Sequence, residues 1–514
     1  MHWGARRHGA RVVRDPIHGD ILLPPIAEAV VGSLEFQRLR YIRQNGLLHF
    51  VFPGAVHTRF AHSLGTMANA QAVWHRLTAD LAEREKSEAF ARAREYLGEV
   101  FELAALLHDV GHCAFSHASE HVEINGAPLF GTVRELFTQW GDAPVLEALI
   151  KHDPKLADRR AKHEEIGLLL IAAIFRTENK LNELCKKLLG VEATIIGADL
   201  VGVLHECKPI DGRRFERCPA FDPSPQFLEH SKVFIEALER RWNRKLSVDD
   251  ATPMLRHILH ELVSGTLDVD RMDYLLRDAS FCGVTYGKYD REILIGSLEI
   301  VPDEDGRLYL TLDTKAAFAL DDLLWSRYQM FIQIYNHKTN VVMGHMLGRA
   351  LAWAIDPIAL LKRPRLREQY VAFTDDLVMG TVFSMCSEAE GARNTPFGRT
   401  LTRRSVPKYV GSALLTAADS AARKDESEQK RHALLADLRG PKLDWWKVQD
   451  GDDDVLAIPA SSDLIKGETP YLRFWEKGAS QPKLEAFANR SSILQSKNFN
   501  ASHHMVHFFK KPTE

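Results

Sequence analysis

Few cysteines and no long apolar run set the first limits on this chain. Its six cysteines are scattered without a Cys-x-x-Cys pair, which argues against a disulfide framework and against a thiolate zinc site. No stretch reaches the roughly 18 apolar residues of a membrane-spanning helix. The basic start, MHWGARRHGARVVRD, lacks the apolar segment of a signal peptide. A net charge of −3 gives no global attraction for nucleic acid or an anionic membrane. We therefore expect a soluble, cytoplasmic protein without a membrane partner.

Helical patterns occupy most of the first 350 residues. LGEVFELAALLHDVG (97–111) is apolar nearly all round, which predicts a buried helix bracketed by Gly98 and Gly111. HEEIGLLLIAAIFR (163–176) has the same character, and 251–279 predicts two helices separated by a break at Gly265. Strand patterns are short: GDILLP (19–24), LYLTLD (308–313) and HHMVHFF (503–509). The segment 208–226 predicts an exposed loop, and the charge run 422–433 predicts a solvated helix face.

His108 and Asp109 stand where the buried helix 97–111 should end. Adjacent residues on a helix point about 100° apart, so both can face one ion only near a helix end. Imidazole and carboxylate suit iron, manganese, zinc, cobalt or nickel. With His62 and Asp270 they would form a set with positions open for water and substrate, which is a catalytic arrangement. Spacing alone also allows the alternative, that each histidine is an ordinary helix cap or a satisfied polar group.

Local charge favours an anionic substrate. Four arginines and one acid, Glu35, lie between residues 34 and 62. Arg59 precedes His62 by three residues and so shares its helix face. The other three, Arg38, Arg40 and Arg43, could equally form a solvated or salt-bridged face.

Six motifs occur in linear order across residues 15–278: DPIHGDILL, FQRLRYIRQNG, VFPGAVHTRFAHSLG, LLHDVGHCAFSHASE, KHEEIG and LDVDRMDYLLRD. Together they resemble the HD-domain superfamily of metal-dependent phosphohydrolases. Within it they are most similar to the deoxynucleoside triphosphate triphosphohydrolases related to the animal sterile-alpha-motif and HD-domain protein. The resemblance covers about residues 10–340, and no sterile-alpha-motif domain is expected before it. It implies a mainly α fold: an HD-type helical domain at 1–360, with its motif core at 15–340, and a mixed α+β subdomain at 361–514 packed on that core.

The resemblance also assigns site residues. The metal ligands are His62, His108, Asp109 and Asp270, and the catalytic residues are His112, His117, His163 and Glu120. The substrate-binding residues are Arg59, Gln44, Arg271, Tyr274, Asp278, Arg327 and Tyr335. Two positions depart from the family pattern, because Glu120 replaces an aspartate and Arg271 replaces a lysine.

The reaction implied is hydrolysis of a dNTP to deoxynucleoside and tripolyphosphate. A water activated by one divalent transition metal attacks the α-phosphorus, and magnesium accompanies the nucleotide. His117 is expected to be the general acid, since imidazole titrates near neutral pH. The alternative is an HD-type phosphodiesterase or exonuclease acting on single-stranded nucleic acid, although no basic stripe interleaved with aromatics supports it. A binding module with a dead site is disfavoured, because every ligand position is filled.

The resemblance further implies a homo-oligomer, either tetramer or hexamer, and a nucleotide effector. Arg11, Arg14 and Arg40 are expected to form the regulatory nucleotide site. The family aspartate that reads guanine is Gly32 here, so we expect strict guanine-nucleotide activation to be lost. Base preference and the choice between pool balance and defence against phage stay open.

Overall fold

The structure, a computed structural model, describes most of the chain up to residue 388. The described residues are 9–354, except 121, 125–126, 142–145, 148–149, 151–154, 206–221 and 247, together with 367–388 and shorter segments between 398 and 510. The segment 208–226 therefore lies largely outside the described residues, although Pro225 begins a helix. Half of the charge run 422–433 also lies outside them.

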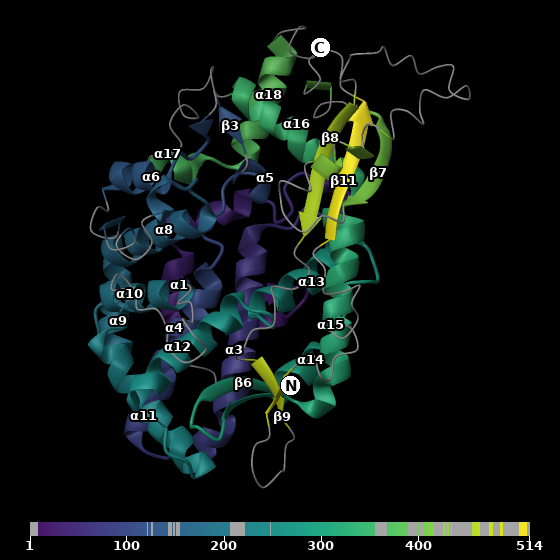
Figure 1. The fold of residues 1–514 in the computed structure, drawn as a ribbon. Coiled ribbons are helices and arrows are strands. Elements are labelled where there is room, and N and C mark those ends of the chain that lie inside the picture. The colour runs from purple at the N-terminus through teal and green to yellow at the C-terminus, as the bar shows by residue number, and fades with distance from the viewer. Residues whose placement is uncertain are drawn as a thin grey trace.

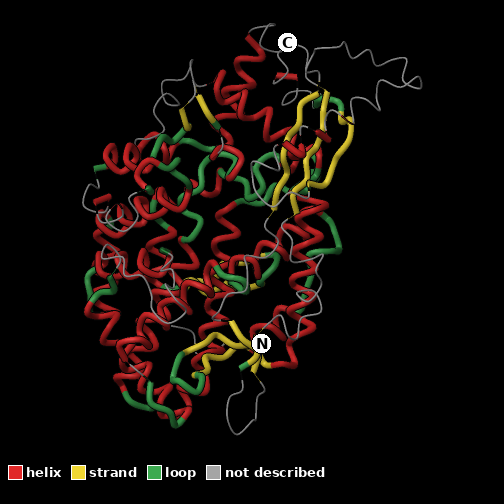
Figure 2. The backbone as a smooth tube through the Cα atoms, in the orientation of Figure 1, coloured by secondary structure: helices red, strands yellow, loops and turns green. Residues whose placement is uncertain are grey.

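Helices dominate the described residues, which confirms the predicted mainly α fold (Figures 1 and 2). The first half contains α1 (Pro25–Val31), α2 (Leu34–Gln37), the 3₁₀ helix η1 (Arg38–Tyr41), α3 (Arg59–Arg84), α4 (Glu88–Leu107), α5 (His117–Glu120), α6 (Val133–Trp140), α8 (His163–Thr177), α9 (Asn179–Leu189), α10 (Ala193–Leu204) and α11 (Pro225–Trp242). The second half contains α12 (Val248–Ser264), α13 (Val269–Cys282), α14 (Arg291–Ser297), α15 (Ala317–Met330), the π-helical η6 (Phe331–Tyr335), α16 (Lys338–Ala354), α17 (Arg367–Ala372) and α18 (Asp375–Glu388).

Helices α3 and α4 form the centre of the core. They pack against each other, α4 also packs on α10 and α11, and α3 packs on α13. The last turns of α4 are fully buried, including Phe101, Leu103 and Leu106. Each such side chain contributes about 2 kcal/mol by leaving water. The prediction that Gly98 marks the start of this helix is wrong: α4 begins at Glu88. Its N-cap, Ser87, accepts a bond from the Phe90 amide.

The predicted break between α12 and α13 is confirmed. Helix α12 ends at Ser264, just before Gly265, and α13 begins at Val269. The side chain of Asp268 caps α13 by accepting a 2.7 Å hydrogen bond from the Arg271 amide. This break turns the chain so that the first turn of α13 faces α3, and it thereby positions Asp270.

All three predicted strands are present, and each has partners that the sequence did not reveal. β1 (Arg11–Asp15) and β2 (Gly19–Leu23) form an antiparallel hairpin. β6 (Leu308–Asp313) pairs with β5 (Leu298–Pro302), and also in parallel with β9 (Leu472–Trp475), which pairs with β10 (Glu485–Ala486). β11 (His503–Lys510) lies between β7 (Tyr409–Leu415) and β8 (Val455–Ser462). A short hairpin joins β3 (Glu123–Ile124) and β4 (Ala127–Pro128).

The segments beyond residue 360 contact the helical core at several points. Tyr370, Phe373, Val378 and Val382 are buried in the same apolar cluster as α3 and α4. Figure 1 shows α18 beside α16, with the sheet β7–β11–β8 also next to α16. The boundary at residue 360 stays a prediction. No described helix combines the length and the hydropathy that crossing a bilayer requires.

Candidate functional site

The turn after α4 carries His108 and Asp109, whose side chains are each 8% exposed. His108 is the C-cap residue of α4, as the sequence predicts. Gly111 follows because a side chain does not fit there: a Cβ would lie 1.9 Å from the carbonyl oxygen of His163. The first turn of α8 can therefore approach the turn closely, which brings His163 near the end of α4.

Two side chains hold the backbone carbonyls of this turn. Arg38 Nη2 donates to the carbonyl oxygens of Val110 at 2.6 Å and His112 at 2.5 Å. The Tyr370 hydroxyl donates to the Gly111 carbonyl. Arg38 is buried, so it does not belong to a solvated helix face. It satisfies carbonyls that a buried turn would otherwise leave without donors.

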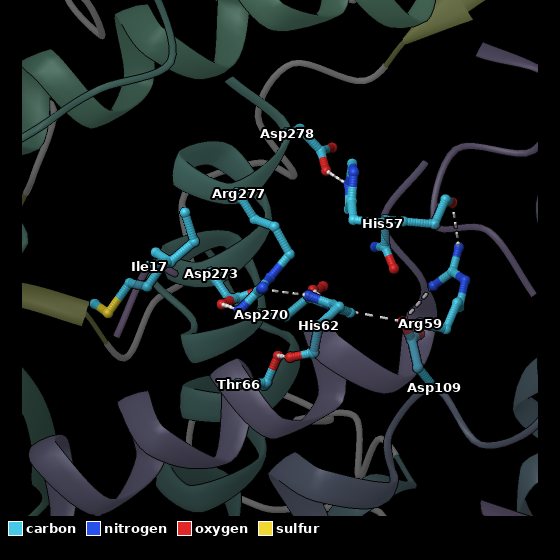
Figure 3. Close-up of polar contacts among 12 residues, drawn as sticks. Ile17, His57, Arg59, His62, Thr66, Asp109, Asp270, Asp273, Arg277 and Asp278 are labelled. Carbon is cyan, nitrogen blue, oxygen red and sulfur yellow. Dashed lines mark hydrogen bonds and ion pairs between the residues drawn. The ribbon is translucent and has the colours of Figure 1, made fainter. Parts of the chain in front are cut away.

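The four residues predicted as metal ligands converge from three parts of the chain, and Figure 3 shows three of them, His62, Asp109 and Asp270. His62 Nε2, from α3, lies 3.0 Å from Asp270 Oδ1, on α13, and 3.4 Å from Asp109 Oδ2. His108 Nε2 lies 3.4 Å from Asp109 Oδ1 and 3.5 Å from Asp270 Oδ1. Donor atoms that surround one ion lie about this far apart, since metal–ligand distances are about 2.0–2.2 Å.

The ring orientation of both histidines suits a metal. His62 donates from Nδ1 to Asp273 Oδ2 at 2.7 Å, and His108 donates from Nδ1 to the carbonyl of Ala105 at 2.8 Å. Both Nε2 atoms are buried and have no hydrogen-bond partner among the described residues. A partner on Nδ1 fixes the tautomer and leaves the Nε2 lone pair for a metal, as metal-bound histidines require. These residues therefore fit a divalent transition metal.

Electrostatics link the four residues closely. Burial disfavours a charged His62, but the carboxylates of Asp109, Asp270 and Asp273 outweigh burial and raise its pKa well above the usual range. Burial also opposes the charge of His108, yet Asp109 and Asp270 raise its pKa. Burial would raise the pKa of Asp270, but His108 and His62 lower it. The acids thus stay ionised and attract a cation, which would replace protons on the imidazoles.

A buried carboxylate that the sequence did not single out supports His62. Asp273 is fully buried and accepts bonds from His62, from His18 Nε2 at 2.6 Å and from Arg277 Nε at 2.8 Å. Arg277 in turn donates to both oxygens of Asp15, at 2.8 and 3.2 Å. The network ties the N-terminal hairpin to a proposed metal ligand. The spacing Asp270–Asp273–Arg277 on one buried helix was the available signal.

Gly65 allows this network to form between α3 and α13. A Cβ at Gly65 would lie 1.9 Å from Asp273 Oδ1 and 2.5 Å from Arg277 Nη2. Only glycine lets the two helices approach so closely.

A second cluster gathers the predicted catalytic residues. Glu120 accepts from His163 Nδ1 at 2.5 Å through Oε1, and from His117 Nδ1 at 3.3 Å through Oε2. His112 stacks on His163, with ring centroids 3.7 Å apart. The longer side chain of Glu120 therefore bridges two imidazoles. Burial would raise the pKa of Glu120, but His117 and His163 hold it far below its usual range. The four side chains also lie close enough together to hold an ion.

Arg59 lies between the two clusters. It donates to Asp109, to Ser116 Oγ at 2.8 Å and to the carbonyl of Gln44 at 3.3 Å. It is buried, and without substrate its guanidinium neutralises Asp109 rather than facing solvent.

Several of the predicted substrate-binding residues also come together. Asp278 Oδ2 accepts from the hydroxyl of Tyr335 at 2.6 Å, and the ring of Tyr335 lies 6.3 Å from that of Tyr274. Asp278 Oδ1 accepts from His57 Nε2 at 2.6 Å, a buried partner that the sequence analysis missed. Arg271 Nη1 donates to the carbonyl of Thr266 at 2.6 Å.

Two further predicted substrate-binding residues, Gln44 and Arg327, are buried. Burial lowers the pKa of Arg327, and this pKa also responds to the charges of Tyr274, Arg271, Asp268 and Asp270. Arg327 therefore lies in the same neighbourhood as these residues.

The predicted regulatory arginines make local contacts. Arg11 pairs with Glu28 at 2.8 Å, and Arg14 pairs with Asp20 at 2.6 Å; both arginines are largely exposed. Arg40 lies over the ring of Phe60, with its Cζ 3.5 Å from the ring centroid. Gly32 is the C-cap residue of α1. Their regulatory role stays a prediction.

The helical core, with histidines and aspartates from α3, α4 and α13 converging at one point, is the arrangement of an HD-domain protein. Comparison with known proteins refines this class. SAMHD1 from Bos taurus, a deoxynucleoside triphosphate triphosphohydrolase, is 43% identical over 543 aligned positions, which cover 98% of this chain and 79% of its own. The chain therefore belongs to the family of the SAMHD1 deoxynucleoside triphosphate triphosphohydrolases. This confirms the resemblance seen in the sequence motifs.

Two further proteins and one solved structure are less similar in sequence. Human SAMHD1 is 26% identical over 505 positions, covering 95% of this chain and 69% of its own. The uncharacterized protein MJ1154 of Methanocaldococcus jannaschii is 26% identical over 374 positions, and the chain spans 56% of its length. A crystal structure of a hypothetical protein from Aquifex aeolicus shares the fold, with a TM-score of 0.57 at 20% identity over 98% of this chain and 96% of its own. No family model matches the sequence.

Proposed function

We propose that this protein hydrolyses dNTPs to deoxynucleosides and tripolyphosphate with the help of one divalent transition metal. The observation that carries the proposal is the convergence of His62, His108, Asp109 and Asp270, in a chain 43% identical to a deoxynucleoside triphosphate triphosphohydrolase. The protein is then an enzyme that acts on the bond between the α-phosphorus and the 5′-oxygen.

The four residues would hold the metal, and their donor set of two imidazoles and two carboxylates suits iron, manganese, zinc, cobalt or nickel. Such an ion supplies Lewis-acid chemistry: it polarises a phosphoryl oxygen and lowers the pKa of a water. Asp273 fixes the tautomer of His62 through the 2.7 Å bond to Nδ1. Magnesium accompanies the triphosphate of the substrate.

The second cluster, which contains His117, Glu120 and His163, carries out proton transfer. Water adds to the α-phosphorus, the bond to the 5′-oxygen breaks, and the leaving oxygen takes a proton from His117. The side chain of His117 is 64% exposed, whereas its partner Glu120 is 8% exposed, so the imidazole can reach a substrate while its carboxylate partner stays fixed. Burial opposes a charge on His163, but Glu120 raises its pKa, which prepares it to hold a second proton near the phosphates.

Charge on the transferring phosphates is balanced by arginines. Arg59 is already buried against Asp109 and is positioned to contact a phosphoryl oxygen next to the metal. Arg271 replaces the lysine of the family pattern, and its planar fork can make two parallel bonds to a phosphate.

Deoxyribose selection follows from the tyrosine pair. Tyr335 is held by its hydroxyl on Asp278, and its ring faces Tyr274 at 70°. A ring fixed against C2′ leaves a 2′-hydroxyl without space or partner, which can reject a ribonucleotide by a few kcal/mol.

Assembly and regulation complete the proposal. The enzyme acts in the cytoplasm as a homo-oligomer, a tetramer or hexamer, and a nucleotide effector contacts Arg11, Arg14 and Arg40. Because Gly32 lacks a side chain to read guanine, GTP is not required. GTP alone switching on an inactive monomer would refute this last point. Both pool balance and defence against phage are compatible with the activity.

Product analysis tests the function. Each of the four dNTPs is incubated with the protein and manganese, and products are separated by anion exchange, with His108→Ala as the control. Deoxynucleoside plus tripolyphosphate, absent with the variant, is the expected result. Nucleoside monophosphates released from single-stranded DNA, with all dNTPs intact, would instead indicate a phosphodiesterase or exonuclease.

A further inference from the structure

Two loops that carry proposed active-site residues meet beside the second cluster. The first, residues 42–47, carries Gln44, and the second, residues 113–117, carries His117. Ser116 Oγ donates to the carbonyl of Arg43 at 2.9 Å and so joins the two loops. Phe115 and Gly46 are also in close contact, since a Cβ at Gly46 would lie 2.9 Å from the Phe115 carbonyl oxygen.

The second loop has an unusual backbone. Phe115 and Ser116 have φ angles of 60° and 55°, in the left-handed region that side chains other than glycine rarely adopt. Two such residues in a row turn the chain sharply after His112 and start α5 at His117. Neither Phe nor Ser favours this conformation, so contacts from outside the loop have to maintain it.

Those contacts come from the C-terminal part of the chain. Asp375, the first residue of α18, accepts from the Phe115 amide at 2.6 Å through Oδ1. Its other oxygen, Oδ2, accepts from the Arg43 amide at 3.1 Å, and Arg43 Nη1 lies 3.6 Å away. Asp375 is fully buried. One carboxylate thus holds both loops, each at the residue next to or near a proposed active-site side chain.

A second contact from the same region acts on the preceding turn. The hydroxyl of Tyr370 donates to the Gly111 carbonyl, and its ring lies under the guanidinium of Arg38 at 4.9 Å. The turn that follows His108 and the loop that precedes His117 are therefore both held from residues 370–375.

We propose that Asp375 is a positioning residue for catalysis: it clamps loops 42–47 and 113–117 together so that Gln44 and His117 face the same substrate. This rests on the proposed function and extends the catalytic unit beyond the predicted boundary at residue 360. Asp375 is not among the proposed substrate-binding or metal-binding residues, and it acts through the backbone amides of Arg43 and Phe115. Asp375 contacts none of the proposed metal-ligand side chains, so we expect metal binding to persist without it.

Kinetics of the full-length protein test the clamp. Asp375→Ala is expected to lower kcat for a dNTP about 100-fold, the loss that a misplacement of about 1 Å can cause. Asp375→Asn, which keeps one acceptor oxygen, is expected to lie between the alanine variant and the wild type. Asp376→Asn changes an exposed neighbour in the same turn and is the matched control, with unchanged kcat. Metal content should be equal in all four proteins.

Hydrogen exchange provides a readout without substrate. In the wild type, the amides of Arg43 and Phe115 should exchange slowly, and in Asp375→Ala both should exchange faster while the amides of α3 and α4 stay protected. If Asp375→Ala does not fold, the kcat of Asp375→Asn and the amide protection factors of the wild type still test the clamp. An unchanged kcat in a folded Asp375→Ala variant, or fast wild-type exchange at both amides, overturns the clamp. A wild type with protected amides but without dNTPase activity would instead refute the proposed function alone.

Discussion

Asp273→Asn is the substitution that connects stability and metal binding most directly. Asp273 accepts bonds from His18, His62 and Arg277, all at 2.6–2.9 Å, in a fully buried position. Removing its charge leaves Arg277 with Asp15 as a single carboxylate partner. Breaking a buried ion pair costs about 3–5 kcal/mol. Because Arg277 keeps its pair with Asp15, we expect the free energy of unfolding to fall by about 3 kcal/mol, the lower end of this range.

The asparagine also weakens the support of His62. It can still accept one bond from Nδ1, but without the negative charge that makes the imidazole a stronger ligand. Loss of such a partner lowers metal affinity about 10–100-fold. For a chain of 514 residues, each kcal/mol shifts the melting temperature by about 1 °C, so the shift in stability should be about 3 °C.

Two assays measure these effects separately. Calorimetry of metal-free protein gives the change in stability, and competition with a chelator gives the change in metal affinity. Asp20→Asn, which removes an exposed carboxylate paired with Arg14, is the control for a general loss of charge. An Asp273→Asn protein with wild-type stability and wild-type metal affinity would refute the role assigned to this network.

Further substitutions test the rest of the site. His108→Ala and Asp109→Ala are each expected to remove the metal and all activity, measured by elemental analysis and product release; a variant that stays active without metal would contradict this. Glu120→Gln should move the alkaline limb of the pH–rate profile to lower pH. Glu120 raises the pKa of His163, so without this carboxylate the imidazole loses its proton at a lower pH. An unmoved limb would show that the proton on His163 does not contribute to the rate. Gly111→Ala should abolish activity, since a Cβ would lie 1.9 Å from the His163 carbonyl oxygen; a folded variant with normal kcat would show that the close approach of α8 is dispensable.

Local sequence patterns predicted the helical core, and the motif resemblance selected most of the residues that the structure brings together in the candidate site. The apolar run before His108 predicted a buried helix ending at the right residue, because a helix that is apolar on all sides is stable only when it is buried. The same local reasoning misplaced its start, since Gly98 lies inside α4 where a Cβ would lie 2.3 Å from Trp74 Nε1. A glycine that makes room for a partner and one that ends a helix look alike in a sequence.

Contacts between distant segments were beyond such reasoning. Asp375 meets Phe115 across 260 residues, and no local pattern marks either partner. Arg38 and Arg40 are two residues apart on η1, yet one is buried against carbonyls and the other lies over Phe60. The parallel pairing of β9 with β6 also depends on the completed core, because a parallel strand is never specified by a hairpin turn.

The most direct test of the central claim follows the oxygen of water through the reaction. A dNTP is hydrolysed by the wild-type protein in ¹⁸O-labelled water, and the products are analysed by mass spectrometry. Attack at the α-phosphorus predicts one ¹⁸O atom in tripolyphosphate and none in the deoxynucleoside. Label in the deoxynucleoside, or its appearance in a nucleoside monophosphate or pyrophosphate, would contradict the account.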